Sequence, residues 1–305
     1  MFFEHRAFWL PKDVQEPNAY EDAFDADGNR GVAAICDGVS SSLFSGRWAL
    51  ILAKAVVAQP PDVRSAQALE AWLKRNREAW LSTFDESTLA WHQKPKLLDG
   101  AATTLLWVEL SRTGAADGVA RPFRLRCFAI GDCCLFHVRG NAVLETFPLQ
   151  QSDKFDNNPQ IIRSVAKRSD AVAFQALETQ CNPGDLLMLC SDAVGAWTMR
   201  QVEAGVEVDW DYYWEMPPEV WQQWIIDLRQ QNQIRIDDST ALLLRIAGGH
   251  SRPPRAKARS QDDEDSLLDK AETKVRGALK SLKGKLRKGL RGLSESKWLT
   301  DEEQK

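Results

Sequence analysis

The order of the predicted elements along the chain indicates an α+β fold. Helical periodicity dominates two early segments, several short strand-like runs follow, and two further helices precede a last strand. An alternating strand–helix order, which is typical of a doubly wound parallel sheet, does not occur. A chain this rich in short strands can pack as a central β-sandwich with its helices on the outside.

The first strand and the first helices are predicted from apolar patterning. Residues 31–36 (GVAAIC) form a short apolar run, and the turn pair Asp37-Gly38 ends it. Residues 45–58 have helical periodicity, for which we expect Ser45 to be the N-cap. Apolar residues recur at steps of three and four through 64–92, which predicts more helix.

Strand-like runs separated by turn residues fill the middle of the chain. After the apolar run 101–110, we expect strands at 123–130, 133–138, 143–148, 171–176 and 186–190. Helical patterns follow at 193–204 and 218–231, and a last strand is predicted at 240–246.

Composition excludes several classes of protein. The 305 residues carry a net charge of −4, which argues against a specific nucleic-acid-binding protein. The first ten residues, MFFEHRAFWL, do not read as a signal peptide, and no apolar run is long enough to cross a bilayer. The six cysteines form no C-x-x-C pair, so we expect small buried residues in a reducing cytoplasm.

A change in composition after Ile246 divides the chain. We expect one folded domain at 1–247, a flexible linker at 248–265 and a basic amphipathic helical tail at 266–305. Between Ser266 and Lys297 there are ten lysines and arginines and three acidic residues. The tail could bind an acidic protein, bind an anionic membrane surface, or fold back on the domain. We therefore expect a cytoplasmic protein, with peripheral membrane attachment through the tail as an alternative.

Acidic residues stand at the ends of the predicted strands. Ionised carboxylates at the ends of apolar strands are costly unless something compensates their charge. Several such carboxylates at the rim of one set of sheets indicate that they bind a common cation. The residues concerned are Glu21, Asp22, Asp37, Asp132, Asp192, Asp237 and Asp238.

Carboxylate oxygens together with a glycine carbonyl are hard ligands suited to Mg²⁺ or Mn²⁺. Two such ions can hold a hydroxide between them for in-line attack on phosphorus. The residue types therefore predict a two-metal hydrolytic site.

Six blocks, in this order, resemble one known family. They are YEDAF, CDGVSSSLFSG, GAATTLL, AIGDCCLF, CSDAVGAW and DDSTALLL, within residues 5–247. Together they are similar to the metal-dependent protein serine/threonine phosphatases of type 2C (the PPM family), in their bacterial branch. The resemblance implies that family's β-sandwich flanked by helices.

The resemblance also implies roles for individual residues. The catalytic set is Asp37, which would bridge two Mn²⁺ or Mg²⁺ ions, with Asp192 and Asp237. The Gly38 carbonyl would ligate one ion, Asp22 would bind through its carboxylate or through water, and Glu21 would stand beside it in the same role. Asp132 resembles an aspartate that helps to bind a third, weaker ion. For Gly100, Thr103 and Thr104, which match the family's small-residue strand start, we expect packing only.

The implied activity is hydrolysis of phosphoserine and phosphothreonine in proteins by a metal-bridging hydroxide. The expected partners are phosphoproteins, in particular a cognate serine/threonine kinase or its targets. The arginine that the family places before the Glu-Asp pair, where it binds phosphate, is absent near Pro17. Arg6, Lys12 and Arg47 are candidates to replace it. The alternative function is a weak or inactive phosphatase-fold sensor that acts through its basic tail.

Overall fold

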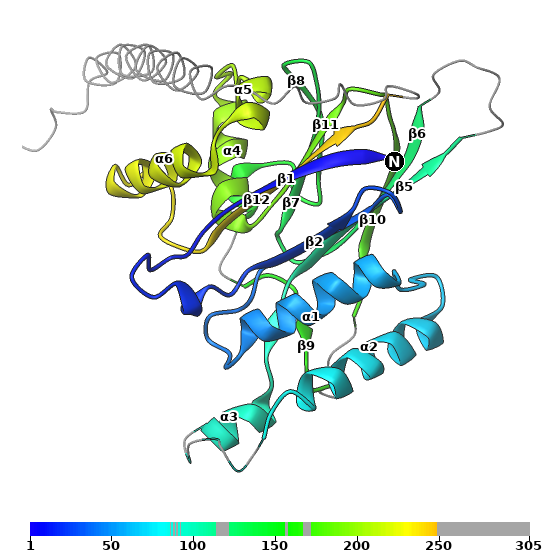
Figure 1. The fold of residues 1–305 in the computed structure, drawn as a ribbon, viewed down its shortest axis with the longest axis vertical. Coiled ribbons are helices and arrows are strands. Elements are labelled where there is room, and N and C mark those ends of the chain that lie inside the picture. Colours follow the sequence, from blue (N-terminus) through cyan, green and yellow to red (C-terminus); the bar gives the residue numbers. More distant parts are fainter. Residues whose placement is uncertain are drawn as a thin grey trace, which may run out of the picture. The chain divides into compact units, whose positions relative to one another are not determined.

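Two five-stranded antiparallel sheets pack face to face in the computed structural model (Figure 1). The structure describes residues 1–248 except 86, 88, 90, 92, 114–121, 156–157 and 167–171. The first sheet has the order β1 (Phe3–Leu10), β12 (Ser239–Ile246), β11 (Leu186–Cys190), β7 (Cys134–Arg139) and β8 (Ala142–Phe147). The second has the order β10 (Gln175–Cys181), β6 (Phe123–Ile130), β5 (Leu105–Arg112), β3 (Val32–Cys36) and β2 (Ala23–Asp27).

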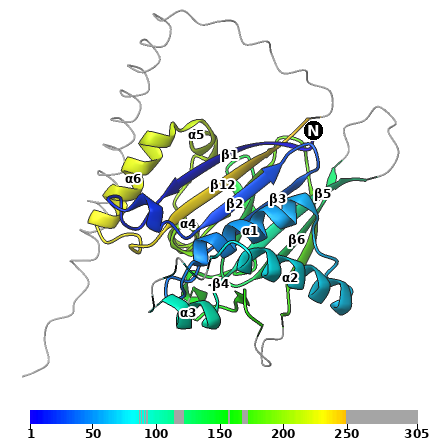
Figure 2. The ribbon, with the colours of Figure 1, turned by 60° about the horizontal axis from the view of Figure 1, so that its bottom comes forward.

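Helices cover the outer face of each sheet, and Figure 2 shows one group on either side of the strands. Helices α1 (Ser45–Ala58) and α2 (Ala66–Leu81) share an apolar core with the second sheet. Helices α4 (Asp192–Glu203), α5 (Trp210–Glu215) and α6 (Pro218–Gln230) share another with the first sheet. The remaining elements are short: η1 (Pro17–Ala19), α3 (Gln93–Asp99), β4 (Ala102–Thr103), η2 (Ser152–Lys154) and β9 (Ile162–Arg163).

Central strands are apolar on both faces because they are buried on both faces. In β11, Met188 and Cys190 belong to the core under α4–α6, whereas Leu187 and Leu189 belong to the core between the sheets. A strand with a core on either side has no solvent face, so its sequence reads as a continuous apolar run. This explains why residues 186–190 were predictable as a strand.

The predicted fold class is confirmed, as are most of the predicted elements, but three details are wrong. The strand expected at 171–176 is β10, which begins four residues later at Gln175. The expected cap Ser45 is the first residue of α1, and Phe44 with a left-handed backbone (φ 64°) takes the cap position. Helix α2 ends at Leu81, well before residue 92. The predicted linker at 248–265 falls almost wholly outside the described residues, and the tail at 266–305 does so entirely.

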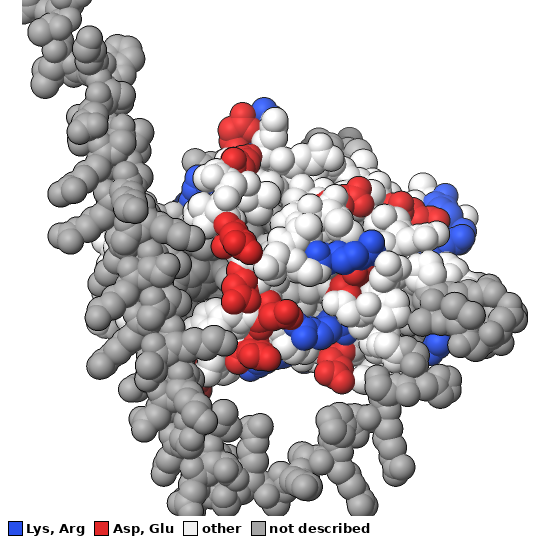
Figure 3. Space-filling view, turned by 90° about the horizontal axis from the view of Figure 1, so that it is seen from above, with Lys and Arg blue, Asp and Glu red and all other residues white. Residues whose placement is uncertain are grey.

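The six cysteines are all buried and unpaired, as expected for core residues. No helix of the described residues is long and apolar enough to span a membrane. On the part of the described surface seen in Figure 3, acidic and basic side chains both occur among uncharged ones.

A buried carboxylate fixes the turn between β10 and β11. Asp185 is 1% exposed and lies 2.8 Å from His137 Nε2, and it accepts hydrogen bonds from Arg139 Nε (2.8 Å) and the Asn182 amide (2.7 Å). Burial alone would raise the pKa of Asp185, but the hydrogen bonds from Arg139, His137 and Asn182 outweigh it and hold the pKa below its ordinary value. The ionised carboxylate therefore stabilises the fold.

We expect Asp185→Asn to lower the free energy of unfolding by about 2 kcal/mol at pH 7, because buried donors lose a charged acceptor. Urea denaturation would measure it. The exposed pair of Asp211 with Arg245 supplies the control, since Asp211→Asn should cost about 0.5 kcal/mol or less.

Because the folded-state pKa of Asp185 is depressed, the stabilisation by its carboxylate is fully present above pH 3.8 and is lost as the pH falls through the folded-state pKa. A difference between wild type and Asp185→Asn that grows on acidification would contradict this.

Candidate active site

The predicted carboxylates come from both sheets at one end of the sandwich, where β1 ends and β2 begins (Figure 1). In the second sheet, Asp22 precedes β2 and Asp37 follows β3. In the first, Asp192 follows β11 as the first residue of α4, and Asp237 precedes β12. Strands that end at the same rim carry these side chains toward one another.

Asp22 joins the two sheets through β12. It is 4% exposed, and its Oδ2 accepts a hydrogen bond from Thr240 Oγ1 at 2.5 Å. The Tyr20 hydroxyl lies 2.6 Å from the same Thr240 oxygen. Its other oxygen, Oδ1, is buried without a hydrogen-bond partner among the described residues. Burial raises the pKa of Asp22 to about 7; hydrogen bonds from Thr240 and Ser191 oppose the rise, whereas the charges of Asp238 and Asp237 add to it.

The main chain of Asp37 is held by Thr103, at the end of β4, and by Thr104, which follows it. Its carbonyl accepts hydrogen bonds from Thr104 N (2.9 Å) and Thr103 Oγ1 (2.7 Å), and its amide donates to Thr104 Oγ1 (3.1 Å). Both threonines therefore do more than the packing that we expected. Burial raises the pKa of the Asp37 carboxyl well above its ordinary value, and neighbouring carboxylates raise it further, in the order Asp22, Asp132, Asp237 and Asp238. These five groups therefore share one electrostatic environment.

Gly38 is required where it stands because the chain around Glu21 passes directly over it. A Cβ atom at position 38 would lie 2.5 Å from the Glu21 carbonyl oxygen. At Gly46, in the first turn of α1, a Cβ would lie 2.8 Å from the Tyr20 carbonyl oxygen. The two glycines thus allow the segment that carries Glu21 and Asp22 to approach Asp37.

The Glu21 carboxylate is turned to protein donors. Its Oε2 accepts hydrogen bonds from Lys12 Nζ (2.7 Å) and Ser40 Oγ (2.6 Å), and its Oε1 accepts one from Ser45 Oγ (2.5 Å). Ser45 therefore serves Glu21 rather than the start of the helix. This environment differs from that of Asp22, whose second oxygen has no donor.

Asp238 clamps two chain segments together. It is 4% exposed, and it accepts backbone hydrogen bonds from Lys12 N and Glu21 N, each at 2.6 Å. Burial raises the pKa of Asp238, against the lowering effect of these two bonds. Its carboxylate thus fixes the position of the residues next to Asp22.

Asp192 and Asp237 share an arginine that sequence reasoning missed. The Arg235 guanidinium forms an ion pair with Asp192 Oδ2, and its Nε lies 3.9 Å from Asp237 Oδ2. Asp192 is 8% exposed, and its Oδ1 is buried without a hydrogen-bond partner in the part of the chain that the structure describes. The only sequence signal was a basic residue two positions before Asp237.

Asp132 lies in the turn that joins β6 of one sheet to β7 of the other. It is 6% exposed, and its charge is among those that raise the pKa of Asp37. The turn thus brings it into the same electrostatic environment. Its role toward a third ion stays a prediction.

Of the three candidates for the phosphate anchor, only Lys12 lies at the carboxylates. Arg6 donates to the backbone carbonyls of Trp214 and Met216. Arg47 donates to the Thr83 carbonyl (3.2 Å) and lies over the Phe84 ring. The Lys12 ammonium, in contrast, is held by Glu21 and Ser40. Arg6 and Arg47 therefore stabilise the outer helices and loops instead.

No group of three or more histidine, cysteine, aspartate or glutamate side chains is gathered tightly enough to hold a metal ion among the described residues. The chemistry of the donors nevertheless fits a divalent cation. Asp22 Oδ1 and Asp192 Oδ1 are buried acceptors without a described donor, and unpaired buried carboxylate oxygens are costly unless a cation or donor compensates them. Small side-chain movements would have to close the cluster around an ion.

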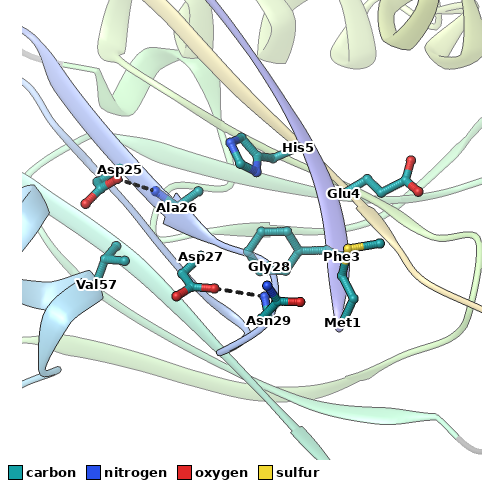
Figure 4. A pocket seen from close by; sticks show the side chains of 10 residues that line it. All are labelled: Met1, Phe3, Glu4, His5, Asp25, Ala26, Asp27, Gly28, Asn29 and Val57. Carbon is teal, nitrogen blue, oxygen red and sulfur yellow. Dashed lines mark hydrogen bonds between the residues drawn. The ribbon is translucent and has the colours of Figure 1, made fainter.

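A separate pocket of about 590 Å³ lies away from these carboxylates (Figure 4). The start of β1 and the far end of β2 line it, with Phe3, His5, Asp25 and Asp27 among the lining residues. Asp25 and Asp27 accept hydrogen bonds from the backbone amides of Ala26 (3.0 Å) and Asn29 (2.9 Å). These are local turn contacts, so the pocket is distinct from the candidate site.

Residues 14–223 match the family model described as protein phosphatase 2C. The chain belongs to this family. It is therefore a protein serine/threonine phosphatase by family, and the family is metal-dependent. No curated protein matches the chain in sequence.

Solved structures agree with the protein phosphatase 2C fold. The photosystem II phosphatase PBCP is 15% identical, with a TM-score of 0.51, over 80% of this chain and 98% of that one. The catalytic domain of the serine/threonine phosphatase PstP, solved in complex with two manganese ions, is 14% identical, with a TM-score of 0.50, over 81% and 99%. At these identities the likeness shows the fold alone.

Arg229 holds the loop of Asp237 in this phosphatase fold. It is 8% exposed and donates to the carbonyls of Pro11 (2.8 Å) and Asp237 (2.5 Å) and to Ser239 Oγ (2.9 Å).

We expect Arg229→Met to lower the free energy of unfolding by about 3 kcal/mol, because several buried acceptors lose their charged donor. Arg200→Met is the matched control, since exposed Arg200 donates to the Gln233 carbonyl of the same loop. Equal losses in urea denaturation would show that Arg229 does not hold the loop.

Proposed function

We propose that this protein phosphatase 2C chain hydrolyses phosphoserine and phosphothreonine esters of proteins at the carboxylate cluster. One observation carries the proposal: the aspartates from both sheets meet at one rim, and two of their buried oxygens, Asp22 Oδ1 and Asp192 Oδ1, have no described donor. An acid cluster of this kind is costly for the fold, and a bound cation would compensate it.

The residues that would hold two Mn²⁺ or Mg²⁺ ions are Asp22, Asp37, the Gly38 carbonyl, Asp192 and Asp237, with Asp132 near a third, weaker position. Bound divalent cations would supply charge neutralisation at the phosphate ester and lower the pKa of water for attack on phosphorus. Glu21, whose carboxylate accepts three protein donors, is better placed to position Lys12 than to bind an ion.

The remaining residues fix the geometry. Thr240 orients Asp22, and Thr103 and Thr104 orient the main chain of Asp37. Lys12 brings a positive charge to the rim, where it is the remaining candidate among those predicted to attract the substrate phosphate. Neither described histidine is at the cluster, since His5 lines the remote pocket and His137 bonds to Asp185, so the leaving group would take its proton from water.

Two carboxylate variants test this assignment. Asp37→Asn and Asp192→Asn should each lower kcat/KM at least about 100-fold for p-nitrophenyl phosphate and for a phosphothreonine peptide with Mn²⁺, because each removes a ligand charge. Asp25→Asn, in the remote pocket, is the control and should keep wild-type kcat/KM. Comparable activity of all three variants would refute the assignment.

The alternative, an inactive phosphatase-fold module that acts through its basic tail, is favoured by one observation: Arg235 already occupies Asp192 and Asp237. A chain that ends at Gly248 separates the two functions. For an active phosphatase we expect its kcat/KM for p-nitrophenyl phosphate to stay within about twofold of that of the full chain, since no predicted site residue is removed. If the truncated chain no longer binds an acidic protein or anionic vesicles that the full chain binds, partner binding belongs to the tail. A full chain that shows no Mn²⁺-dependent turnover would support the inactive module.

A further inference from the structure

Arg235 places a guanidinium on the carboxylates that are proposed to hold a metal ion. It belongs to the loop between α6 and β12, two residues before Asp237. Its Nη2 pairs with Asp192 Oδ2, and its Nε lies 3.9 Å from Asp237 Oδ2. A guanidinium and a divalent cation would therefore compete for the same two oxygens.

The surroundings of Arg235 differ from those of Arg229, a second arginine of this region. Arg229 is buried, and backbone carbonyls and Ser239 hold it, so it is part of the framework. The Arg235 side chain is 40% exposed, and both of its described ion pairs are with carboxylates of the cluster. A long, half-exposed side chain already has part of its surface in water, so its charged end can turn toward solvent when another cation takes its place.

Asp192 needs a compensating charge even when no metal is bound. Asp192 is almost buried, with a side chain 11% exposed, and such a carboxylate is unfavourable without a compensating charge. The single guanidinium of Arg235 carries one positive charge and shares it between the two carboxylates. A divalent ion brings twice the charge and binds the oxygens directly.

We propose that Arg235 is the resident counter-ion of the metal-free site, and that it must leave Asp192 and Asp237 before a divalent cation binds there. The proposal rests on the function proposed above. Arg235 stabilises the metal-free protein and, by the same interaction, weakens metal binding, because any free energy gained by the ion pair is lost when the ion displaces it. It therefore sets the cation concentration at which the phosphatase becomes loaded.

Calorimetric titration of Mn²⁺ into the metal-free full-length chain tests the proposal directly. Replacing the guanidinium by Arg235→Gln or Arg235→Ala should lower the Kd for Mn²⁺ roughly tenfold, since the competitor is removed. Arg200→Ala is the matched control, because Arg200 is exposed and contacts the same loop through the Gln233 carbonyl but is not part of the cluster. It should leave the Kd unchanged.

Thermal unfolding separates competition from a structural role. The Tm of Arg235→Gln should fall relative to wild type without metal and recover with saturating Mn²⁺, whereas a structural residue would lower the Tm equally in both conditions. An unchanged or larger Kd in both Arg235 variants would overturn the proposal. If wild type binds Mn²⁺ and the variants bind it no more tightly, only this proposal fails; if no protein binds Mn²⁺, the proposed function fails with it.

Discussion

Electrostatic repulsion among buried carboxylates is the constraint on which this end of the molecule depends. Asp22, Asp192 and Asp238 are each at most 8% exposed, and neighbouring negative charges reinforce the effect of burial on Asp22 and Asp37. Hydrophobic packing cannot relieve such repulsion, since it only withdraws the charges further from water. The contacts around the cluster are therefore of two kinds, donors that hold individual carboxylates and cations that compensate them.

The β-sandwich brings the carboxylates together because its strands end at a common rim. Strands β3 and β11 are buried on both faces, and a carboxylate stands just beyond the end of each: Asp37 after β3, and Asp192 after β11 and the buried Ser191. Thr240 and Asp238 then join the rims of the two sheets, through Asp22 and through the amide of Glu21. The position of the site thus follows from the packing of the core and not from a separate binding loop.

The sequence predicted most accurately the elements whose pattern is set by burial. Helix α1 and strands β6 and β11 were found within a residue, because apolar periodicity defines them. Edge strand β10 was predicted four residues early, since most of its residues face solvent and only Cys181 is buried. The strand-end aspartates were visible in the chain order, whereas Arg229 and Arg235 were not. Their roles depend on tertiary contacts, of Arg229 with Leu10 at 219 positions' separation and of Arg235 with Asp192, which a local sequence pattern does not reveal.

If the cluster is a metal site, its carboxylates and Arg235 must change partners when cations arrive. Anomalous diffraction from crystals of the full chain soaked in Mn²⁺ tests this most directly. We expect two manganese peaks bounded by Asp22, Asp37, Asp192 and Asp237, with the Arg235 guanidinium withdrawn from Asp192. Manganese found only at the remote pocket of Asp25 and Asp27, or an Arg235–Asp192 ion pair that persists at saturating Mn²⁺ with no peak beside it, would contradict the assignment.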